Sequence, residues 1–360
     1  MSSDPLPAVE AGWLSPARLT SGLRAGGSLA DDVSVVDVVA AEVGTGQMAS
    51  CVRLQLRFDG ATKTPSSMIA KIPAIDETSR RAGAAGAYET EVRFYQALAP
   101  RVSIRTPACY YAGLGPEPGE FLLLLEDLAP AQQGDQLAGC SPAHAELAVL
   151  EAARLHGPTF GATEIRDAHG WLVREMVGTG APGMGPIMAT LYPAFCQRYD
   201  GRIEPEVLAV GERILGKLEN YYANEGPASV IHGDYRLDNL LFGTAEGGPP
   251  VAVVDWQTHL WGDPIADVSY FIGSGLVPED RRVHERDLVE SYCQAMGAMG
   301  HSMEADECWR RYRLHAIAGW HMAVFAAMVV VRTERGDDMF CTMANRHGRQ
   351  MLDLDTEALL

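Results

Sequence analysis

Cysteine is sparse in this chain of 360 residues, and its seven cysteines are scattered. They form no CxxC pair and no pattern of metal ligands: Cys51, Cys109, Cys140, Cys196, Cys293, Cys308 and Cys341. An odd number of cysteines in a long chain argues against a disulfide framework and fits a reducing compartment. We therefore expect a cytoplasmic protein without such a framework.

Positive charge and long apolar runs are also in short supply. The chain has 29 lysines and arginines against 47 aspartates and glutamates, a formal net charge of −18, which repels nucleic acid and anionic membranes. Segment 1–15 lacks the basic and apolar parts of a secretion signal. The most apolar stretch, 317–331, is short for a bilayer span and contains His321, so we expect a buried helix. No nucleic-acid or membrane partner is expected, and the oligomeric state is not indicated.

Hydrophobic periodicity divides the chain into a β-rich part and a helical part. Strands are predicted at 33–43, 51–58, 66–73 and 120–128, and helices at 13–24 and 87–99. From Ser141 helical patterns prevail, at 141–157, 185–199, 204–224, 284–298 and 304–332, with one β-like region at 229–256. Because the chain exceeds the usual size of one hydrophobic core, we predict an α+β fold of two domains, 1–126 and 127–360.

The densest polar cluster is HGDYRLDN, residues 232–239, which runs directly into an apolar strand. Asp234 and Asn239 are five residues apart, and Asp255 follows on the next predicted strand. An aspartate that accepts a hydroxyl proton, with an asparagine and an aspartate that bind Mg²⁺, is the set found in kinase active sites. Hard oxygen ligands suit Mg²⁺, which offsets phosphate charge. We predict Asp234 as catalytic base and Asn239 and Asp255 as metal ligands. The alternative is a polar turn between two strands.

A kinase also needs a lysine for the nucleotide phosphates, held by a glutamate. Lys71 lies within the apolar stretch MIAKIPA, where an unpaired ammonium would be costly. In the predicted helix 87–99, Glu91 shares the apolar stripe, whereas Glu89 points elsewhere. We therefore predict a Lys71–Glu91 pair at a nucleotide site. The alternative is an exposed lysine and an exposed glutamate.

Two further segments are candidates for nucleotide binding. GTGQMA, residues 44–49, leads into a strand and not a helix, so it is predicted to be a hairpin and not a dinucleotide fingerprint. Gly44 and Gly46 would let its backbone N–H groups approach phosphates, unless the hairpin is only a turn. The strand 120–128 ends at the predicted join, where we expect the backbone of Glu126, Asp127 and Leu128 to contact adenine.

Three more polar residues accompany the central motif. His232 is expected to organise the loop by hydrogen bonds, because Asp234 is better placed to meet a substrate hydroxyl. Arg236 either steadies the transferring phosphoryl group or is solvated. Asp267, in GDPIADVSYF, is expected to bond to the backbone of the catalytic loop and not merely to cap a helix.

These motifs resemble the aminoglycoside phosphotransferase and choline-kinase-like superfamily. The E-x-x-F-Y and E-D-L pieces are similar to its ecdysteroid-kinase-like branch, and the resemblance runs from about residue 30 to 275. It implies a bilobal protein-kinase-like fold that phosphorylates hydroxyls of small molecules with ATP and Mg²⁺. It also implies that Asp234 is the base, that Asn239 and Asp255 bind Mg²⁺, and that Lys71 contacts phosphate with Glu91 as its partner.

The sequence departs from protein kinases after Asp255. Trp256 and Gln257 stand where those enzymes have Phe and Gly, and only eight residues separate Asp255 from Pro264. That distance is too short for a long regulatory activation segment, so we expect a small-molecule acceptor. The acceptor itself is not indicated.

Other functions stay open at this point. A catalytically silent nucleotide-binding protein would keep the same residues, and a metal-dependent phosphohydrolase would use His232, Asp234 and Asp255. In the C-terminal helices His315, Trp320 and His321 recur at helical spacing. They either pack in the core or line an acceptor pocket.

Overall fold

The computed structural model describes residues 12–44, 48–173 and 183–360. The chain separates into two compact units. The described residues of 1–100, 106–130 and 255–257 form the first, which we call the N-lobe; 101–105, 131–254 and 258–360 form the second, the C-lobe. A three-residue segment around Trp256 thus belongs to the N-lobe although its neighbours in sequence belong to the C-lobe.

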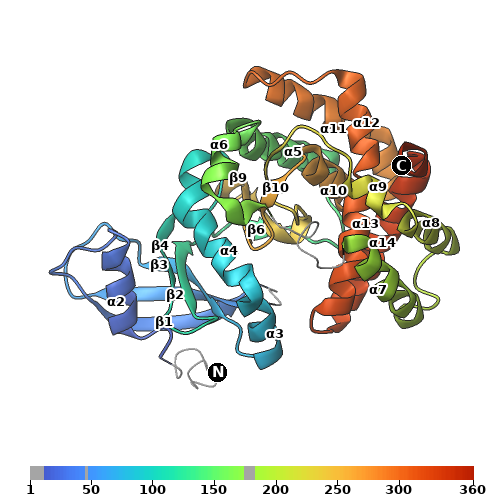
Figure 1. The fold of residues 1–360 in the computed structure, drawn as a ribbon. Coiled ribbons are helices and arrows are strands. Elements are labelled where there is room, and N and C mark those ends of the chain that lie inside the picture. The colour runs from blue at the N-terminus through green and yellow to red at the C-terminus, as the bar shows by residue number, and fades with distance from the viewer. Residues whose placement is uncertain (1–11, 45–47, 174–182) are drawn as a thin grey trace. The chain divides into compact units, whose positions relative to one another are not determined.

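A five-stranded antiparallel sheet forms the centre of the N-lobe (Figure 1). Its order is β1-β2-β3-β5-β4, with bounds Val35–Val43, Ala49–Phe58, Ser67–Pro73, Phe121–Glu126 and Cys109–Leu114 in that order. Strand β2 alternates as predicted: Val52, Leu54 and Leu56 are buried, whereas Gln55 and Arg57 are exposed. Strand β4 was not predicted.

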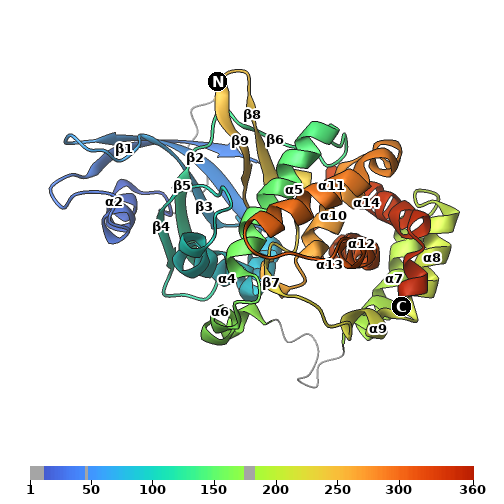
Figure 2. The same cartoon turned by 90° about the horizontal axis from the view of Figure 1, so that it is seen from above.

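Helix α2, Pro16–Ala25, lies across one face of this sheet in both ribbon views (Figures 1 and 2). It begins as predicted, because the Ser15 side chain accepts a hydrogen bond from the Arg18 N–H and Pro16 takes the first helical position. Its buried leucines, Leu19 and Leu23, join the apolar cluster on that face of the sheet. The opposite face is thereby left to carry polar groups.

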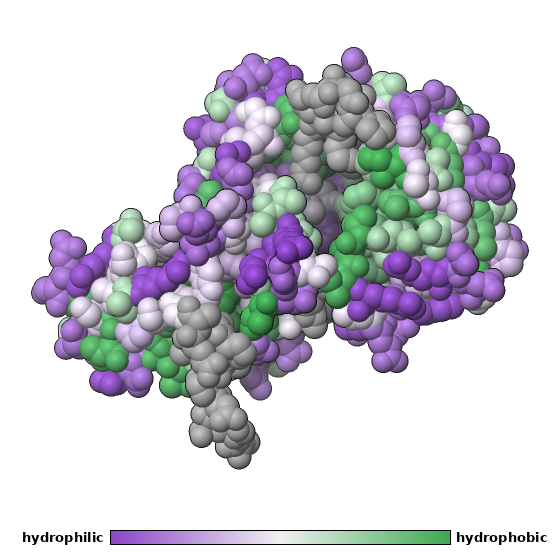
Figure 3. Space-filling model, turned by 60° about the horizontal axis from the view of Figure 1, so that its bottom comes forward, coloured by the Kyte–Doolittle hydropathy of each residue, from purple (hydrophilic) through white to green (hydrophobic). Residues whose placement is uncertain are grey.

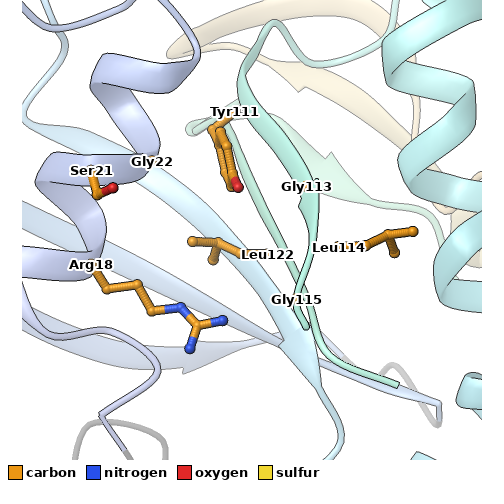
Figure 4. Close-up of a pocket in the computed structure, with 8 residues that line it drawn as sticks. All are labelled: Arg18, Ser21, Gly22, Tyr111, Gly113, Leu114, Gly115 and Leu122. Atoms are coloured by element: carbon orange, nitrogen blue, oxygen red, sulfur yellow. The ribbon is translucent and has the colours of Figure 1, made fainter. Parts of the chain in front are cut away.

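A small pocket of about 90 Å³ lies on the α2 side of the sheet (Figure 4). Arg18, Gly22, Tyr111 and Leu122 are among its lining residues. Successive side chains of a strand point to opposite faces, so Leu122 and Leu123 face opposite ways, and Lys71 pairs in register with Leu123. This pocket is therefore separate from the face of the sheet that carries Lys71.

Helical turns between β3 and β4 supply the rest of the N-lobe. They are α3, Glu77–Ala82, and α4, Tyr88–Arg93, with π-helical turns at Gly83–Ala87 and Phe94–Leu98. The predicted helix 87–99 is therefore real but irregular. Helix α4 packs against β4 and β5, which places its buried residues Glu91 and Val92 toward the sheet.

The C-lobe is built around helix α10, Ile265–Gly275, in which every residue except Ala266 is buried. The ribbon shows α10 among its neighbours α5, α11, α12, α13 and α14 (Figure 2). Their bounds are Pro142–His156, Pro278–Ala298, Ala305–Leu314, Ala316–Val329 and Glu334–Asp353. Shorter helices are α6, α7, α8 and α9, at Thr163–Ala168, Met184–Arg198, Pro205–Leu215 and Leu218–Tyr222. The C-lobe is thus mainly helical, as predicted.

Two small sheets carry the polar motifs of the C-lobe. One has the order β6-β8-β9, with bounds Gln132–Gln133, Leu240–Thr244 and Gly247–Val253. The other pairs β10, Leu260–Gly262, with β7, Ser229–Ile231. The polar motif at 232–239 lies between β7 and β8, which confirms the predicted β-like region.

Two predictions about the C-lobe need correction, and two of its features were not predicted. The pattern 204–224 forms two helices, α8 and α9, since α8 ends at the Gly216 cap; 304–332 also forms two, since the chain leaves the helix at His315. Helix α14 was not predicted. One disulfide, Cys293–Cys308, is present among the described residues and joins the neighbouring helices α11 and α12. The spacing of these two cysteines in the sequence does not predict that they pair.

The surface of the C-lobe mixes polar and apolar residues (Figure 3). Its exposed large apolar side chains include Val329 and Val331, which are 51% and 39% exposed. Isolated exposed apolar side chains are normal on protein surfaces. Across the described residues, no helix has the length and apolar character needed to cross a membrane.

Candidate active site

The N-lobe part of the candidate site centres on Lys71, on β3. Its ammonium Nζ lies 2.7 Å from Glu91 Oε2 and 2.9 Å from Oε1, and Glu91 is 1% exposed. Glu89, two residues before Glu91, pairs instead with Arg93 on the exposed side of α4. The structure therefore confirms that Lys71 pairs with Glu91. It also confirms that Glu89, which lies off the apolar stripe, points elsewhere.

Asp255 joins this pair within the N-lobe. Its Oδ1 lies 2.9 Å from Lys71 Nζ, and its carboxylate is 35% exposed. The backbone of Asp255 has φ = 66°, in the left-handed region that non-glycine residues adopt rarely. Such strain is maintained only where surrounding contacts impose it, and it is common at functional sites.

The two residues after Asp255 supply those contacts. Trp256 stacks on Phe94 with ring centroids 3.7 Å apart, and Gln257 Nε2 donates to Glu91 Oε2 at 3.2 Å. The Trp256 N–H also points to Glu91 Oε1, at 3.4 Å. Trp256 and Gln257, the departures from protein kinases, thus attach the Asp255 segment to α4.

The charge balance of this cluster holds Lys71 protonated. Burial alone would lower the pKa of Lys71, but the carboxylates of Asp255 and Glu91 outweigh burial and raise that pKa above its ordinary value. Cys51 pairs in register with Lys71 on β2, and burial raises the pKa of its thiol to about 11. The cluster therefore presents a permanent cation beside a partly exposed carboxylate.

Most polar groups of the segment 126–128 already make hydrogen bonds within the N-lobe. The Asp127 carboxylate receives two bonds from Arg53, at 2.9 and 3.1 Å, and one from Ser67 Oγ at 2.5 Å. Glu126 bonds to Ala108 through both its backbone N–H and its carboxylate. Leu128 is buried, and its backbone N–H donates to no group in the described part of the chain.

The glycine hairpin is only partly described. Gly44 has φ = 79° and is exposed, with open space where a Cβ would lie. Gly46 lies outside the described residues. The predicted role of this hairpin at phosphates stays a prediction.

The C-lobe part of the candidate site centres on Asp234. Arg236 Nε approaches both carboxylate oxygens, at 3.1 and 3.0 Å, and Asn239 Nδ2 donates to Oδ2 at 3.0 Å. The Tyr270 hydroxyl donates to Oδ1 at 2.7 Å. Sequence reasoning missed Tyr270, because it lies in an apolar helical run that indicates core packing.

Asp267 holds the backbone of this loop. Its two oxygens accept hydrogen bonds from the N–H groups of His232, at 2.6 Å, and Gly233, at 2.9 Å. His156 Nε2 lies 3.2 Å from Oδ2. Burial would raise the pKa of Asp267, but its hydrogen bonds and its electrostatic interactions with His156 and His232 outweigh burial and lower that pKa below its ordinary value. The prediction that Asp267 bonds to the catalytic-loop backbone is confirmed.

His232 is buried and connects strands around the loop. Its Nε2 lies 3.0 Å from the Val254 carbonyl, and Thr258 Oγ1 donates to the His232 carbonyl at 3.0 Å. The Asp234 N–H faces its Nδ1 at 3.3 Å. These contacts are those of a residue that organises the loop.

Arg236 belongs to a partly buried ion-pair network, and its own side chain is 17% exposed, so it is not a freely solvated side chain. Its Nη1 lies 2.7 Å from Asp238 Oδ2, and Arg335 on α14 contacts both oxygens of Asp238 at 2.9 and 3.0 Å. Gln136 also donates its N–H to Asp238. Asp238 and Arg335 were not predicted, since Asp238 was one of several polar residues in the motif and Arg335 is distant in sequence.

Asn239 is fixed by its own amide. Its Nδ2 donates to the Asp234 carbonyl at 2.8 Å as well as to the carboxylate, so its Oδ1 is turned away and accepts no hydrogen bond within the described residues. Its backbone carbonyl accepts from the Val254 N–H at 2.9 Å, and Val254 directly precedes Asp255 in the chain. An amide oxygen and a carboxylate are donors that fit Mg²⁺, which keeps several of its waters and needs few protein ligands.

The described residues contain no cluster of three or more His, Cys, Asp or Glu side chains that would hold a metal unaided. Such a cluster is what a metal-dependent phosphohydrolase would require.

The residues considered for an acceptor pocket divide into two kinds. Trp320 is buried and packs against Tyr192, so it belongs to the core. His315 lies between Tyr221 and Asp263, at 3.0 Å from each, and His321 Nδ1 lies 3.0 Å from the Tyr222 hydroxyl. These histidines have structural partners.

Comparison with known proteins agrees with this architecture. The structure resembles *Plasmodium vivax* ethanolamine kinase, with a TM-score of 0.51 and 8% identity over 90% of this chain and 83% of that one. It also resembles the GDP and kanamycin complex of APH(2″)-IIIa, with a TM-score of 0.51 and 14% identity over 86% of this chain and 91% of that one. The chain therefore has the bilobal fold of small-molecule kinases, with a β-rich N-lobe and a helical C-lobe.

A model of the ecdysteroid kinase-like family matches residues 44–304. The chain belongs to the ecdysteroid kinase-like family. Among curated relatives, it is 26% identical over 129 residues to acyl-CoA dehydrogenase family member 11 of *Gallus gallus*. That match takes in 29% of this chain but only 16% of the chicken protein, so the chain spans a small part of that relative's length.

Proposed function

We propose that this protein is an ATP-dependent phosphotransferase that moves the γ-phosphate to a hydroxyl of a small organic molecule. The observation that carries this proposal is Lys71, a buried ammonium held at 2.7 Å from Glu91 and 2.9 Å from Asp255. Burying such a cluster is costly, so it is retained where its charges have a use. Family membership and the kinase fold support the same reading.

The nucleotide would bind to the N-lobe. Lys71 provides the positive charge for its phosphates. The backbone N–H of Leu128, which donates to no group among the described residues, can donate a hydrogen bond to an acceptor on the base edge. The GDP bound in the APH(2″)-IIIa complex supports nucleotide binding by this fold. Asp127 contributes through its backbone, since Arg53 and Ser67 already occupy its carboxylate.

Asn239 Oδ1 and the Asp255 carboxylate are the groups that would hold Mg²⁺ with the nucleotide. When bound, the ion neutralises charge on the phosphate oxygens. The protein's own part is to keep the amide oxygen of Asn239 oriented, through the two bonds from its Nδ2 to Asp234.

Asp234 is the proposed base. The acceptor hydroxyl gives its proton to the Asp234 carboxylate as its oxygen forms a bond to the γ-phosphorus. The bond between that phosphorus and the β–γ bridging oxygen breaks, and ADP leaves with the electron pair. Arg236, which is bound to Asp234 and Asp238, holds the base in place and adds positive charge beside it.

The test is ATP consumption with Mg²⁺ and a panel of hydroxylated compounds that includes ethanolamine, kanamycin and ecdysteroids. We expect at least one acceptor to stimulate ADP release, and Asp234→Asn to abolish the stimulation. Asp338→Asn, at an exposed ion pair of the same lobe, serves as the matched control and should remain active. Tight ATP binding without turnover on any acceptor would instead identify a silent nucleotide-binding protein.

A further inference from the structure

Asp234 has a hydrogen-bond partner that lies outside every motif of the chain. The Tyr270 hydroxyl, on α10, is 2.7 Å from Asp234 Oδ1, and Tyr270 is 3% exposed. An ionised carboxylate can only accept hydrogen bonds, so the phenol is the donor. Bonds to a charged acceptor are among the stronger ones that proteins make.

The Tyr270 ring is itself held from behind. It stacks on His347 with ring centroids 5.3 Å apart and planes 8° from parallel, and His347 Nδ1 lies 3.1 Å from Gln350 Oε1. Gly319 on α13 leaves room for both rings: a Cβ there would lie 2.0 Å from His347 atoms and 2.5 Å from Tyr270 Cδ2. The packing therefore leaves the phenol oxygen little freedom to move away from Asp234.

The other donors do not fix the carboxylate equally well. Arg236 Nε is shared between both oxygens, and Asn239 Nδ2 reaches only Oδ2. Without the phenol, Oδ1 would keep, among the described residues, the shared bond from Arg236 alone. Burial raises the pKa of Tyr270 well above its ordinary value, so the hydroxyl keeps its proton.

We propose that Tyr270 is a positioning residue, whose hydroxyl sets the rotation of the Asp234 carboxylate so that the base meets the acceptor hydroxyl at a productive angle. This inference rests on the proposed function. The phenol touches neither nucleotide nor cation in this scheme, so its loss should slow the transfer step and leave ATP affinity unchanged.

The test compares Tyr270→Phe with Tyr199→Phe. Tyr199 is an equally buried tyrosine of the C-lobe whose hydroxyl donates to the Asp337 carboxylate at 2.8 Å. Each change removes one oxygen from a hydroxyl–carboxylate bond and keeps the ring. ADP release from MgATP is measured with water as acceptor and then with the most active alcohol of the panel, beside the Kd of ATP and the melting temperature.

We expect Tyr270→Phe to lower kcat by about 10- to 100-fold with the Kd of ATP unchanged, because small misplacements of a catalytic group have effects of this size. Tyr199→Phe should keep the wild-type kcat even if both variants lose similar thermal stability. Gly319→Ala, which displaces the same ring from behind, provides a second variant with the same expected pattern.

Two results are distinguishable from one another. If the wild-type enzyme turns over and Tyr270→Phe matches it in kcat, or if both tyrosine variants lose kcat in proportion to stability, the positioning role is overturned while the proposed function stands. If the wild type itself transfers no phosphate, the proposed function fails first.

Discussion

Lys71 Nζ lies 2.9 Å from Asp255 Oδ1, although the two residues are 184 positions apart in the chain. Asp255, which follows β9 in the chain, thus lies in the same compact unit as Lys71 on β3. Glu91 completes the cluster, so one ammonium is shared by two carboxylates. The predictions below follow from this cluster and from the contacts around Asp234.

Removal of the Lys71 charge should destabilise the protein through Glu91. Lys71→Met leaves a carboxylate that is 1% exposed without its cation, which should lower the free energy of unfolding by about 3–5 kcal/mol. The double variant Lys71→Met with Glu91→Gln should regain part of that loss, because no buried charge is then left unpaired. Chemical denaturation of the three variants measures the recovery; an additive double variant would show that the pair is not coupled.

Replacement of Asp267 by Asn should lower kcat by more than the loss of folding stability alone explains. In Asp267→Asn the amide can accept only one of the two backbone N–H groups, so unfolding should become easier by about 1–3 kcal/mol. The loop that carries Asp234 loses its support, and kcat should fall. Asp337→Asn, at another buried carboxylate of the C-lobe, is the control: it should lose similar stability in thermal unfolding but retain kcat.

Two helical glycines should respond in opposite directions to alanine. Gly319→Ala forces a Cβ against the His347 ring, and overpacking of this kind lowers stability by about 1–3 kcal/mol. Gly297→Ala, in α11, meets no atom closer than 3.9 Å and should be neutral or stabilising, since alanine favours helix by about 1 kcal/mol. The melting temperatures of the two variants measure this difference. Equal changes in melting temperature for Gly319→Ala and Gly297→Ala would contradict the packing described around Tyr270.

Stability should decline below neutral pH partly through His347. Burial lowers the pKa of this residue to about 3, so the folded protein keeps the ring neutral while the unfolded chain takes up a proton below about pH 6.5. This contribution is therefore complete above pH 6.5 and is lost as the pH falls toward 3, at up to about 1.4 kcal/mol per pH unit. Denaturation between pH 7 and 5 should show a smaller decline in His347→Asn than in wild type.

The control for that pH dependence is the exposed residue His144, whose replacement by Asn should leave the decline as it is in the wild type. A wild-type protein equally stable at pH 7 and pH 5 would contradict the assignment of a buried neutral ring.

The sequence predicts best where one side chain breaks an apolar pattern. Lys71 and Glu91 stand out on a buried strand and a buried helical stripe, and their pairing follows from the cost of burying either alone. Asp267 is likewise conspicuous at the start of an apolar helix. Each of these charges needs a partner, which is why its structural contact could be inferred.

Contacts made by residues that fit their surroundings could not be inferred in this way. Tyr270 matches the apolar run of α10, so only the fold reveals that its hydroxyl reaches Asp234. Helix α14 mixes charged residues among its buried ones, because Arg335, Arg346 and others bond to the loop and to neighbouring helices. Apolar residues nevertheless recur at helical spacing on its buried side, at Met339, Phe340, Met343 and Ala344, so this helix could have been predicted from the sequence.

The most direct test of the account is detection of the product. Wild-type protein is incubated with Mg²⁺, ATP labelled in its γ-phosphate and the acceptor panel, and the labelled acceptor is identified by mass spectrometry. The account predicts transfer of the label to a hydroxyl of one acceptor class by the wild type and none by Asp234→Asn. Label that appears only as free phosphate, or transfer that persists undiminished in Asp234→Asn, would contradict it.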